Sequence, residues 1–248
     1  MYINDINILY YLGIGILGLL IGQFIDWCNG RLPEYKKVFS KEFFTVYLKE
    51  AKPKYLLMVA NAVMYVGLLY FFGFSIDTLK YMFLVPMLIS AFVIDYRLQI
   101  IPNRLTLTIF ETGLIFTFAS VMINTNAGIS IFMNNMLGMI VGGGIFLIIT
   151  LIGGLIAGKD AMGFGDVKLM GALGLFFGWM NIIMVAVMAF LLAAVISIII
   201  LVSRKKKADE YIPFGPFIVI SAIIAIFVPS TLLLTILFKI FTLGLYKG

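Results

Sequence analysis

The chain has no histidine and a single cysteine, Cys28. One cysteine excludes an intramolecular disulfide and any zinc site built from several cysteines, so we expect no metal site. The missing histidine excludes zinc metalloprotease motifs and the catalytic pairs in which histidine activates a serine or a cysteine. Charged residues are also scarce, at 12% of the chain, whereas soluble domains have about 25%.

Hydrophobic residues make up 62% of the 248 residues, which predicts an all-α, polytopic membrane protein rather than a soluble domain. A span needs about 20 apolar residues, and on this basis we predict a helix bundle of about eight to nine spans. The apolar stretches cover residues 6–25, 55–74, 81–94, 105–123, 131–157, 167–177, 181–202 and 212–228. A last stretch, 230–245, fits either a ninth span or an interfacial helix.

The same stretches predict a single membrane domain over residues 1–248. Residues 26–54 form a short basic loop within it, without a zinc module, and residues 229–248 contain an extra C-terminal apolar helix. The first apolar stretch has no small-residue cleavage site, so we expect it to remain in the protein as a span.

Basic residues cluster in the loop 26–54 and again at 204–207. Short loops rich in lysine and arginine stay in the cytoplasm, which predicts a multi-pass protein of the cell membrane with its N-terminus outside. A net charge of +6 is also typical of proteins that bind nucleic acid. In a membrane protein the basic loops account for it, so we expect membrane lipid and no nucleic acid as partners.

Two acidic residues, Asp95 and Asp166, each lie where a strongly apolar stretch gives way to a short polar one. An ionised carboxylate at membrane depth costs about 2.5–3.5 kcal/mol, so it tends to face a wet cavity or to have a function. The predicted topology brings both residues to the cytoplasmic face. Two carboxyl groups that meet there cannot both ionise and must share a proton.

Each aspartate also has a purely structural explanation. Asp95 fits an interfacial carboxylate paired with Arg97 or Arg104, and Asp166 fits a cap for the helix that follows it. Two wider alternatives remain, an ion-coupled transporter with a carboxylate pair and a membrane scaffold with its aspartates in ion pairs. Against the transporter, both aspartates lie at one face rather than at the midplane, and the two halves show no clear repeat.

Asp166 follows two glycines, Gly163 and Gly165, with one residue between them. Glycine has no Cβ, so an extended substrate can approach the carboxylate closely there. Lys168 lies two residues further on. One interpretation is that Lys168 binds a substrate carboxylate or tunes the pKa of the aspartate pair. The other is that its side chain extends to the lipid headgroups.

Four segments resemble one family, the bacterial type IV prepilin peptidases. Asp95, followed by Ile-Pro-Asn-Arg-Leu-Thr at 101–106, resembles their first aspartate motif, and residues 163–174 resemble the second. Residues 212–217 resemble their C-terminal segment, and Gly22-Gln23-Phe24 with Arg31 and Pro33 resemble the end of their first span. The family belongs to the intramembrane aspartyl proteases with a Gly-x-Gly-Asp motif.

This resemblance implies an aspartic endopeptidase that removes the short basic leader from type IV prepilins and pseudopilins at the cytoplasmic face. Asp95 and Asp166 match the two catalytic aspartates of the family. We expect a wet cavity between the third span and the start of the sixth, which closes on substrate. Around the pair, the motifs suggest residues that bind or support the substrate, namely Gly163, Gly165, Lys168, Pro102, Asn103, Pro213, Gly215 and Pro216.

The chain departs from the family in its first loop. Many members have a longer loop with paired CxxC motifs that bind zinc, and here the loop is short and has only Cys28. Asp26 stands where the family has an asparagine. Many members also methylate the new N-terminus of the pilin with S-adenosylmethionine, and this activity stays open here. Proteolysis by two aspartates needs no cofactor.

Overall fold

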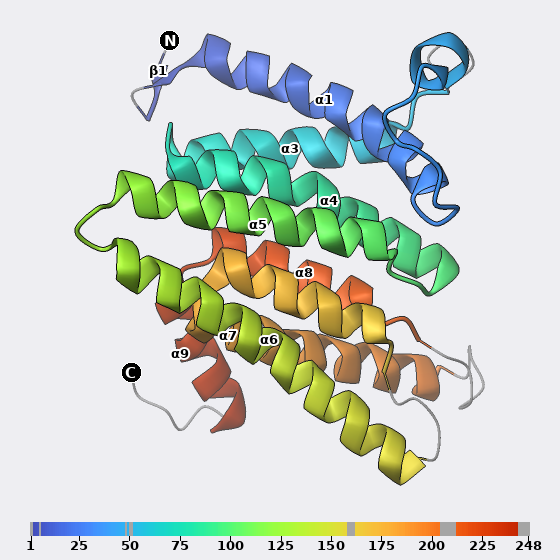
Figure 1. The fold of residues 1–248 in the computed structure, drawn as a ribbon, viewed down its shortest axis with the longest axis vertical. Helices are drawn as coiled ribbons and strands as arrows, with labels where there is room; N and C mark the ends of the chain where they lie inside the picture. The colour runs from blue at the N-terminus through green and yellow to red at the C-terminus, as the bar shows by residue number, and fades with distance from the viewer. Residues whose placement is uncertain are drawn as a thin grey trace. The chain divides into compact units, whose positions relative to one another are not determined.

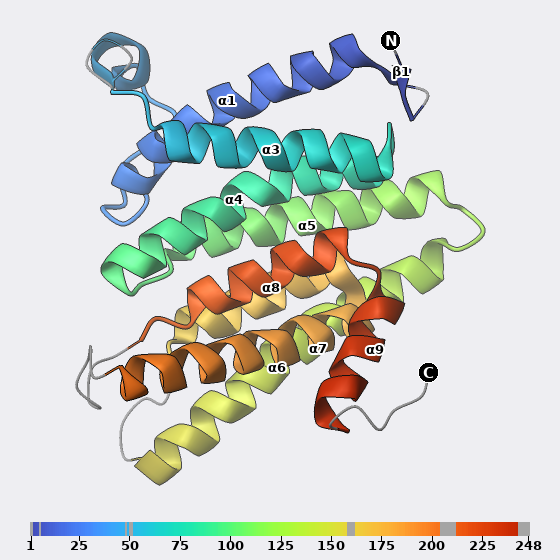
Figure 2. The same cartoon turned by 180° about the vertical axis from the view of Figure 1, so that it is seen from behind.

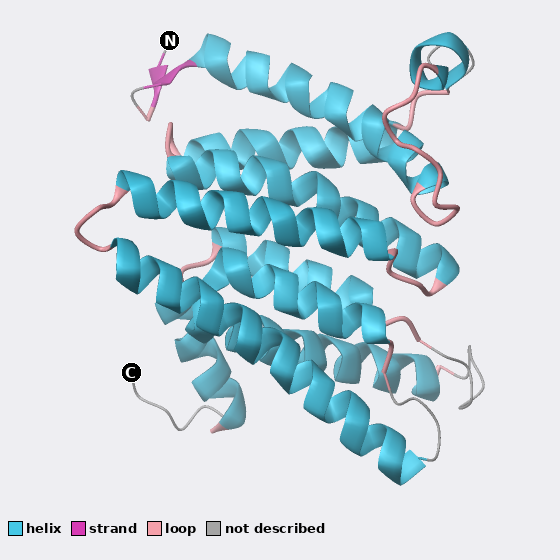
Figure 3. Ribbon diagram, in the orientation of Figure 1, coloured by secondary structure: helices cyan, strands magenta, loops and turns pink. Residues whose placement is uncertain are grey.

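The computed structural model describes residues 2–4, 6–47, 49, 52–157, 162–203 and 212–242. The described residues are helical apart from connections and two short antiparallel strands, β1 (Tyr2–Ile3) and β2 (Ile6–Asn7), which confirms the all-α class (Figure 3). The chain divides into two compact units, Met1–Thr112 and Gly113–Gly248. The basic residues 204–207 lie outside the described residues.

Six of the described helices are long and apolar enough to cross a membrane. This confirms a multi-pass membrane protein. These helices are α1 (Ile8–Arg31), α3 (Tyr55–Phe72), α4 (Ile76–Leu98), α5 (Asn103–Ile123), α6 (Gly128–Ala157) and α7 (Phe164–Val202). The shorter ones are the π-helix η1 (Phe43–Tyr47), α8 (Gly215–Phe227) and α9 (Ser230–Phe241).

In unit 1, α1, α3 and α4 pack against one another (Figures 1 and 2). Glycines in α1 allow α3 to approach closely, since a Cβ on Gly18 would lie 2.6 Å from the Cα of Ala62. The fully buried Asn61 donates a hydrogen bond of 2.9 Å to the Gly18 carbonyl. Small residues and interhelical hydrogen bonds are what hold helices together in lipid, where apolar burial gives little driving force.

Two helices of unit 1 extend beyond the predicted spans. α1 continues from residue 25 to Arg31 because its last turn packs onto the following loop: the Trp27 indole N–H donates to the Val38 carbonyl at 2.9 Å, and the Arg31 guanidinium lies 4.0 Å from the centre of the Trp27 ring. α4 begins at Ile76 because the Ser75 hydroxyl accepts the N–H of Thr78, which caps the first turn.

In unit 2, α6 packs along α7, and glycines again set the contact (Figure 2). α7 has 39 residues, which would make a straight helix about 58 Å long, far more than a bilayer needs. It is broken at Gly178, where φ is 73° and ψ is 173°. Only glycine adopts this conformation readily. The Asn181 side chain donates to the Phe177 carbonyl at 3.1 Å beside the break.

The two parts of α7 fold back on each other at Gly178. A Cβ on Gly142 of α6 would meet both the Met170 carbonyl oxygen, at 2.5 Å, and the Ile182 side chain, at 2.9 Å. In a straight helix these two residues would be about 18 Å apart. The predicted stretches 167–177 and 181–202 therefore correspond to the two arms of a hairpin.

The glycine contact between α1 and α3 can be tested with Gly18→Ala, because the added Cβ meets backbone rather than a mobile side chain. We expect this variant to lose about 1–3 kcal/mol of stability, seen as a lower Tm in detergent. Gly13→Ala on the same helix is the matched control, since nothing lies within 4 Å of its Cβ position. Equal Tm values for the two variants would contradict the packing described.

Candidate active site

Asp95 lies in the last turn of α4 and is only 4% exposed. Its backbone carbonyl accepts the N–H of Gln99 at 2.8 Å, and Gln99 has a φ of 56°. A residue in this left-handed conformation ends the helix. The structure thus places a buried carboxyl group beside a helix end rather than in the middle of a span.

Pro102 and Asn103 follow this turn and begin α5. Pro102 is buried, and its carbonyl accepts the N–H groups of Leu105 and Thr106 at 3.0 and 3.2 Å. Asn103 is exposed, and its carbonyl accepts the Thr106 hydroxyl at 3.0 Å. The short connection from Gln99 keeps both predicted support residues at the Asp95 end of α4.

Asp166 lies in the first turn of α7 and is also 4% exposed. Gly163 is the N-cap residue, and its carbonyl accepts the N–H of Asp166 at 3.0 Å. The explanation of Asp166 as the capping residue is therefore wrong. Its place in the first turn favours a negative charge, because the exposed N–H groups of a helix start carry partial positive charge.

The other residues of this motif lie around the same helix start. Gly163 and Gly165 are partly buried, and Lys168 is exposed. The Lys168 ammonium lies 5.4 Å from the centre of the Phe164 ring, within cation–π distance. Lys168 therefore reaches back over the first turn of α7, at the end that carries Asp166.

Pro213, Gly215 and Pro216 lie at the start of α8, with Gly215 and Pro216 buried. Phe214, between them, anchors this start: its ring centre lies 5.0 Å from that of Phe190 in α7 and 5.8 Å from that of Phe146 in α6. This aromatic cluster was missed in the sequence, because it joins three segments far apart in the chain.

The starts of α7 and α8 both pack against the middle of α6. A Cβ on Gly143 would lie 3.8 Å from the Val167 carbonyl oxygen, and Phe146, one turn further along α6, contacts Phe214. The predicted site residues thus form two sets. One set in unit 1 surrounds Asp95, and one in unit 2 surrounds Asp166.

A polar network in unit 1 was also missed. The Tyr47 hydroxyl lies 3.1 Å from both an Asp26 carboxylate oxygen and the Gln23 carbonyl, and it accepts from the Gln23 amide at 2.8 Å. Burial, followed by the negative charge of Asp26, raises the pKa of Tyr47. The hydroxyl therefore keeps its proton and donates it. Gln23 and Asp26 lie three residues apart on one face of α1. The sequence could indicate this pairing only if the helix was predicted to continue past residue 25.

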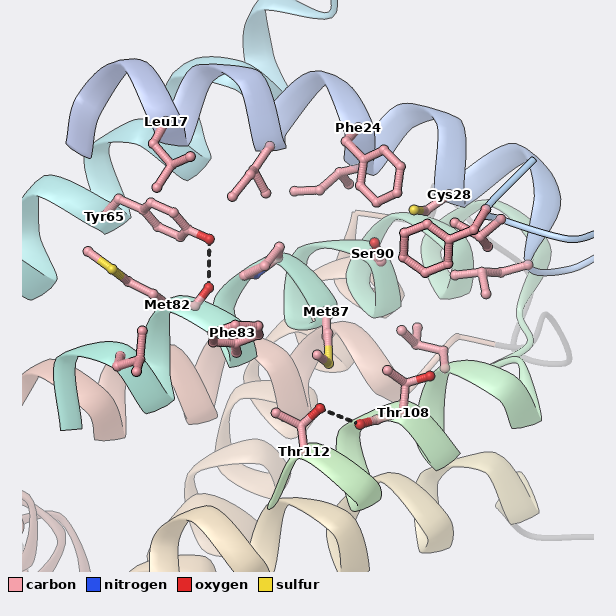
Figure 4. Close-up of a pocket in the computed structure, with 18 residues that line it drawn as sticks. Leu17, Phe24, Cys28, Tyr65, Met82, Phe83, Met87, Ser90, Thr108 and Thr112 are labelled. Carbon is pink, nitrogen blue, oxygen red and sulfur yellow. Dashed lines mark hydrogen bonds between the residues drawn. The ribbon is translucent and has the colours of Figure 1, made fainter. Parts of the chain in front are cut away.

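Unit 1 also encloses a cavity of about 740 Å³ between α1, α4, α5 and the loop after α1 (Figure 4). Its walls are mostly apolar, and three hydroxyl groups among them already bond to backbone carbonyls. Tyr65 donates to Met82, Thr108 to Arg104, and Thr112 to Thr108.

The fold and these two helix ends define a multi-pass helical membrane protein with a buried aspartate at one end of each of two spans. Residues 82–198 match the model of the type IV leader peptidase family. The match confirms the resemblance inferred from the motifs: this segment of the chain belongs to the type IV leader peptidase family.

Several curated proteins named prepilin leader peptidase/N-methyltransferase are similar to the chain. The one from Legionella pneumophila is 33% identical over 156 residues, which are 63% of this chain and 52% of that protein. The one from Aeromonas hydrophila is 29% identical over 149 residues, 60% of this chain and 49% of that protein. The chain thus spans about half the length of these relatives. No solved structure matches it.

The network at Tyr47 can be tested with a double-mutant cycle. We expect Tyr47→Phe and Asp26→Asn each to lower the Tm, with a coupling free energy of about 0.5–1 kcal/mol, because the first removes the shared hydrogen bond and the second replaces its charged acceptor with a weaker, neutral amide oxygen. Tyr55→Phe is the control, since this side chain is 72% exposed, and its effect should add to that of Asp26→Asn. Additive effects of Tyr47→Phe and Asp26→Asn would disprove the contact.

Proposed function

We propose that the chain is an intramembrane aspartic endopeptidase that removes the basic leader from type IV prepilins or pseudopilins, with Asp95 and Asp166 as its catalytic pair. The family match and the names of the relatives support the activity. The observation that carries the proposal is the position of the two buried carboxyl groups, one at the end of α4 and one at the start of α7.

Chain connectivity supports a common membrane face for these two helix ends. Only α5 and α6 lie between α4 and α7 in the chain, and both are long enough to span. Two crossings return a chain to the face it left. This count supports a common membrane surface for Asp95 and Asp166, as a shared site requires.

Basic residues support a cytoplasmic location for that surface. The loop between α1 and α3 carries Lys36, Lys37 and Lys41. Two crossings, by α3 and α4, separate this loop from the end of α4, so it lies on the Asp95 side. The positive-inside rule then supports a cytoplasmic site and an N-terminus outside.

We count eight spans, with α7 as two because of its hairpin and α8 as the eighth. The 13 residues of α8 reach about 20 Å, which is short for a full crossing. α9 is either a ninth span or an interfacial helix. All helices then belong to a single membrane domain, with the basic loop on its inner side.

In the proposed reaction, the two carboxyl groups hold one proton between them. The ionised carboxylate takes a proton from a water, whose oxygen attacks the scissile carbonyl carbon, and the protonated carboxyl donates its proton to the carbonyl oxygen. The carboxyl that took the proton from water then gives it to the amide nitrogen, the C–N bond breaks, and the other carboxylate takes a proton back from a hydroxyl of the intermediate. The leader leaves with a carboxylic acid end and the pilin with a free amine. Neither role is assigned to one aspartate, because the pair titrates as a unit.

The other predicted residues have supporting roles in this scheme. Gly163 and Gly165 leave room for the substrate backbone beside Asp166, and Lys168 reaches over the same helix start. Pro102 and Asn103 hold the turn after Asp95. Pro213, Gly215 and Pro216 lie at the start of α8, which Phe214 packs against the same middle stretch of α6 as the start of α7.

The relatives' names include N-methyl transfer, for which the family uses S-adenosylmethionine. The cavity in unit 1 does not fit this cofactor, which is charged and carries polar groups along its whole length. The cavity walls are apolar, and the hydroxyls of Tyr65, Thr108 and Thr112 already bond to backbone carbonyls. We derive no methyl-transfer step from the described residues.

The proposal is tested by co-expression with a prepilin. We expect Asp95→Asn and Asp166→Asn each to reduce leader removal by at least about 100-fold, because each removes an acid–base group. Asp77→Asn is the matched control on α4, where Asp77 pairs with Lys80 at 2.7 Å near the other end of the helix. All three variants should insert at normal levels.

Normal processing by both Asp95→Asn and Asp166→Asn would overturn the assignment. Solute flux by the wild-type protein without any cleavage would favour the transporter. The positions of the two aspartates near helix ends argue against a transporter, whose coupling site is expected near the bilayer midplane.

A further inference from the structure

The cavity of about 740 Å³ in unit 1 (Figure 4) is lined by neither Asp95 nor Asp166. α1 and α4 form two of its walls with Leu17, Phe24, Phe83 and Met87, and the first half of α5 adds a third with Leu105. All three helices are long and apolar enough to span a membrane. Leu17 and Phe83 are also about half exposed, so this side of the cavity faces hydrocarbon rather than water.

The cavity suits an apolar ligand because most of its lining is apolar and three of its hydroxyl groups already bond to backbone carbonyls. The Tyr65 hydroxyl donates to the Met82 carbonyl at 2.6 Å, and the Thr112 hydroxyl donates to the Thr108 carbonyl at 2.7 Å (Figure 4). A polar ligand would find few free donors there. Burying its own polar groups without partners would cost it several kcal/mol.

Volume distinguishes between two apolar occupants. A membrane helix about 30 Å long and about 10 Å across fills roughly 2,400 Å³, more than three times the cavity. A methylene group fills about the same volume as a liquid water, about 30 Å³, so a chain of about 16 carbons needs roughly 480 Å³. One acyl chain therefore fits within the 740 Å³, and a whole helix does not.

One end of the cavity carries positive charge. The loop residues Val38 and Phe39 line it, and they directly follow Lys36 and Lys37, which are both exposed. Lys36 pairs with Glu34 at 2.5 Å, so the charges of these two residues offset each other. The neighbouring Lys37 then gives this end of the cavity a net positive charge.

Arginines hold the same loop in place. The Arg104 guanidinium donates to the carbonyls of Tyr35 and Lys36 at 2.6 and 3.2 Å, and that of Arg31 donates to the Lys37 carbonyl at 2.9 Å. Phe39 is 90% exposed beside them. Exposed aromatic and basic residues together are typical of the headgroup level of a membrane.

We propose that this cavity is a binding site for an anionic phospholipid, with one acyl chain between α1, α4 and α5 and the phosphate at Lys37. The acyl chain replaces water or empty space in an apolar cavity. Each lysine near an anionic headgroup contributes about 1 kcal/mol. The inference depends on the membrane location and not on the proposed peptidase activity.

Native mass spectrometry of the full chain, with phosphatidylglycerol or phosphatidylcholine added, tests this site. We expect one phosphatidylglycerol to stay bound, and Met87→Trp, which fills the cavity, to weaken its retention at least tenfold. Val63→Trp is the matched control, because Val63 lies on α3, is 62% exposed and does not line the cavity. Equal retention by the two variants would place the lipid elsewhere and overturn the proposal.

The headgroup is tested separately. Lys37→Gln should weaken retention of phosphatidylglycerol about fivefold, which corresponds to the loss of one lysine, and should leave phosphatidylcholine unchanged. Lys239→Gln on α9 is the control and should have no effect. An equal loss for both lipids, or for both variants, would remove the assignment of the phosphate to Lys37.

The wild-type chain offers a test that needs no substitution in the cavity. Its only cysteine, Cys28, lines the cavity and can be labelled with an apolar maleimide. We expect phosphatidylglycerol to slow the labelling at least tenfold. An unchanged labelling rate would contradict the proposal. Protection of Cys28 that appears only when the chain forms dimers would also contradict it, because a second copy of the chain would then occupy the cavity.

Discussion

A carboxyl group removed from water is the constraint on which the rest of this structure depends. Asp95 and Asp166 each keep only 4% of their surface exposed. An isolated ionised carboxylate is very costly in such surroundings. Two carboxyl groups that share a proton carry one charge instead of two and gain a hydrogen bond. In the proposed mechanism the same arrangement activates a water, so sharing a proton both lowers the cost of burying the two carboxyl groups and makes them reactive.

Glycines and helix ends set the position of each carboxyl group. In unit 1, Gln99 in the left-handed conformation ends α4 one turn after Asp95. In unit 2, the hairpin at Gly178 keeps the first arm of α7 short, and the glycine contacts with α6 hold that arm in place. The hydrophobic packing of each unit therefore leaves its aspartate buried at a helix end.

The apolar stretches and the place of both aspartates near helix ends could be predicted from the sequence, because hydrophobic length acts locally. The division of α7 could also be predicted, since Gly178 interrupts its apolar run. The extension of α1, the Tyr47 network and the cavity could not. They depend on contacts between segments far apart in the chain, such as Trp27 with Val38 and Arg104 with Tyr35, which no local pattern indicates.

The central claim is that residues 95 and 166 meet, and a cysteine pair tests it most directly. In a Cys28→Ser background, Asp95→Cys with Asp166→Cys can form a disulfide only if the two Cα atoms come within about 7 Å. We expect oxidation in the presence of uncut prepilin to join them, seen as a linked peptide by mass spectrometry. Asp77→Cys with Asp166→Cys should stay unlinked. If residues 95 and 166 never link, with or without substrate, the account of a shared proton is wrong.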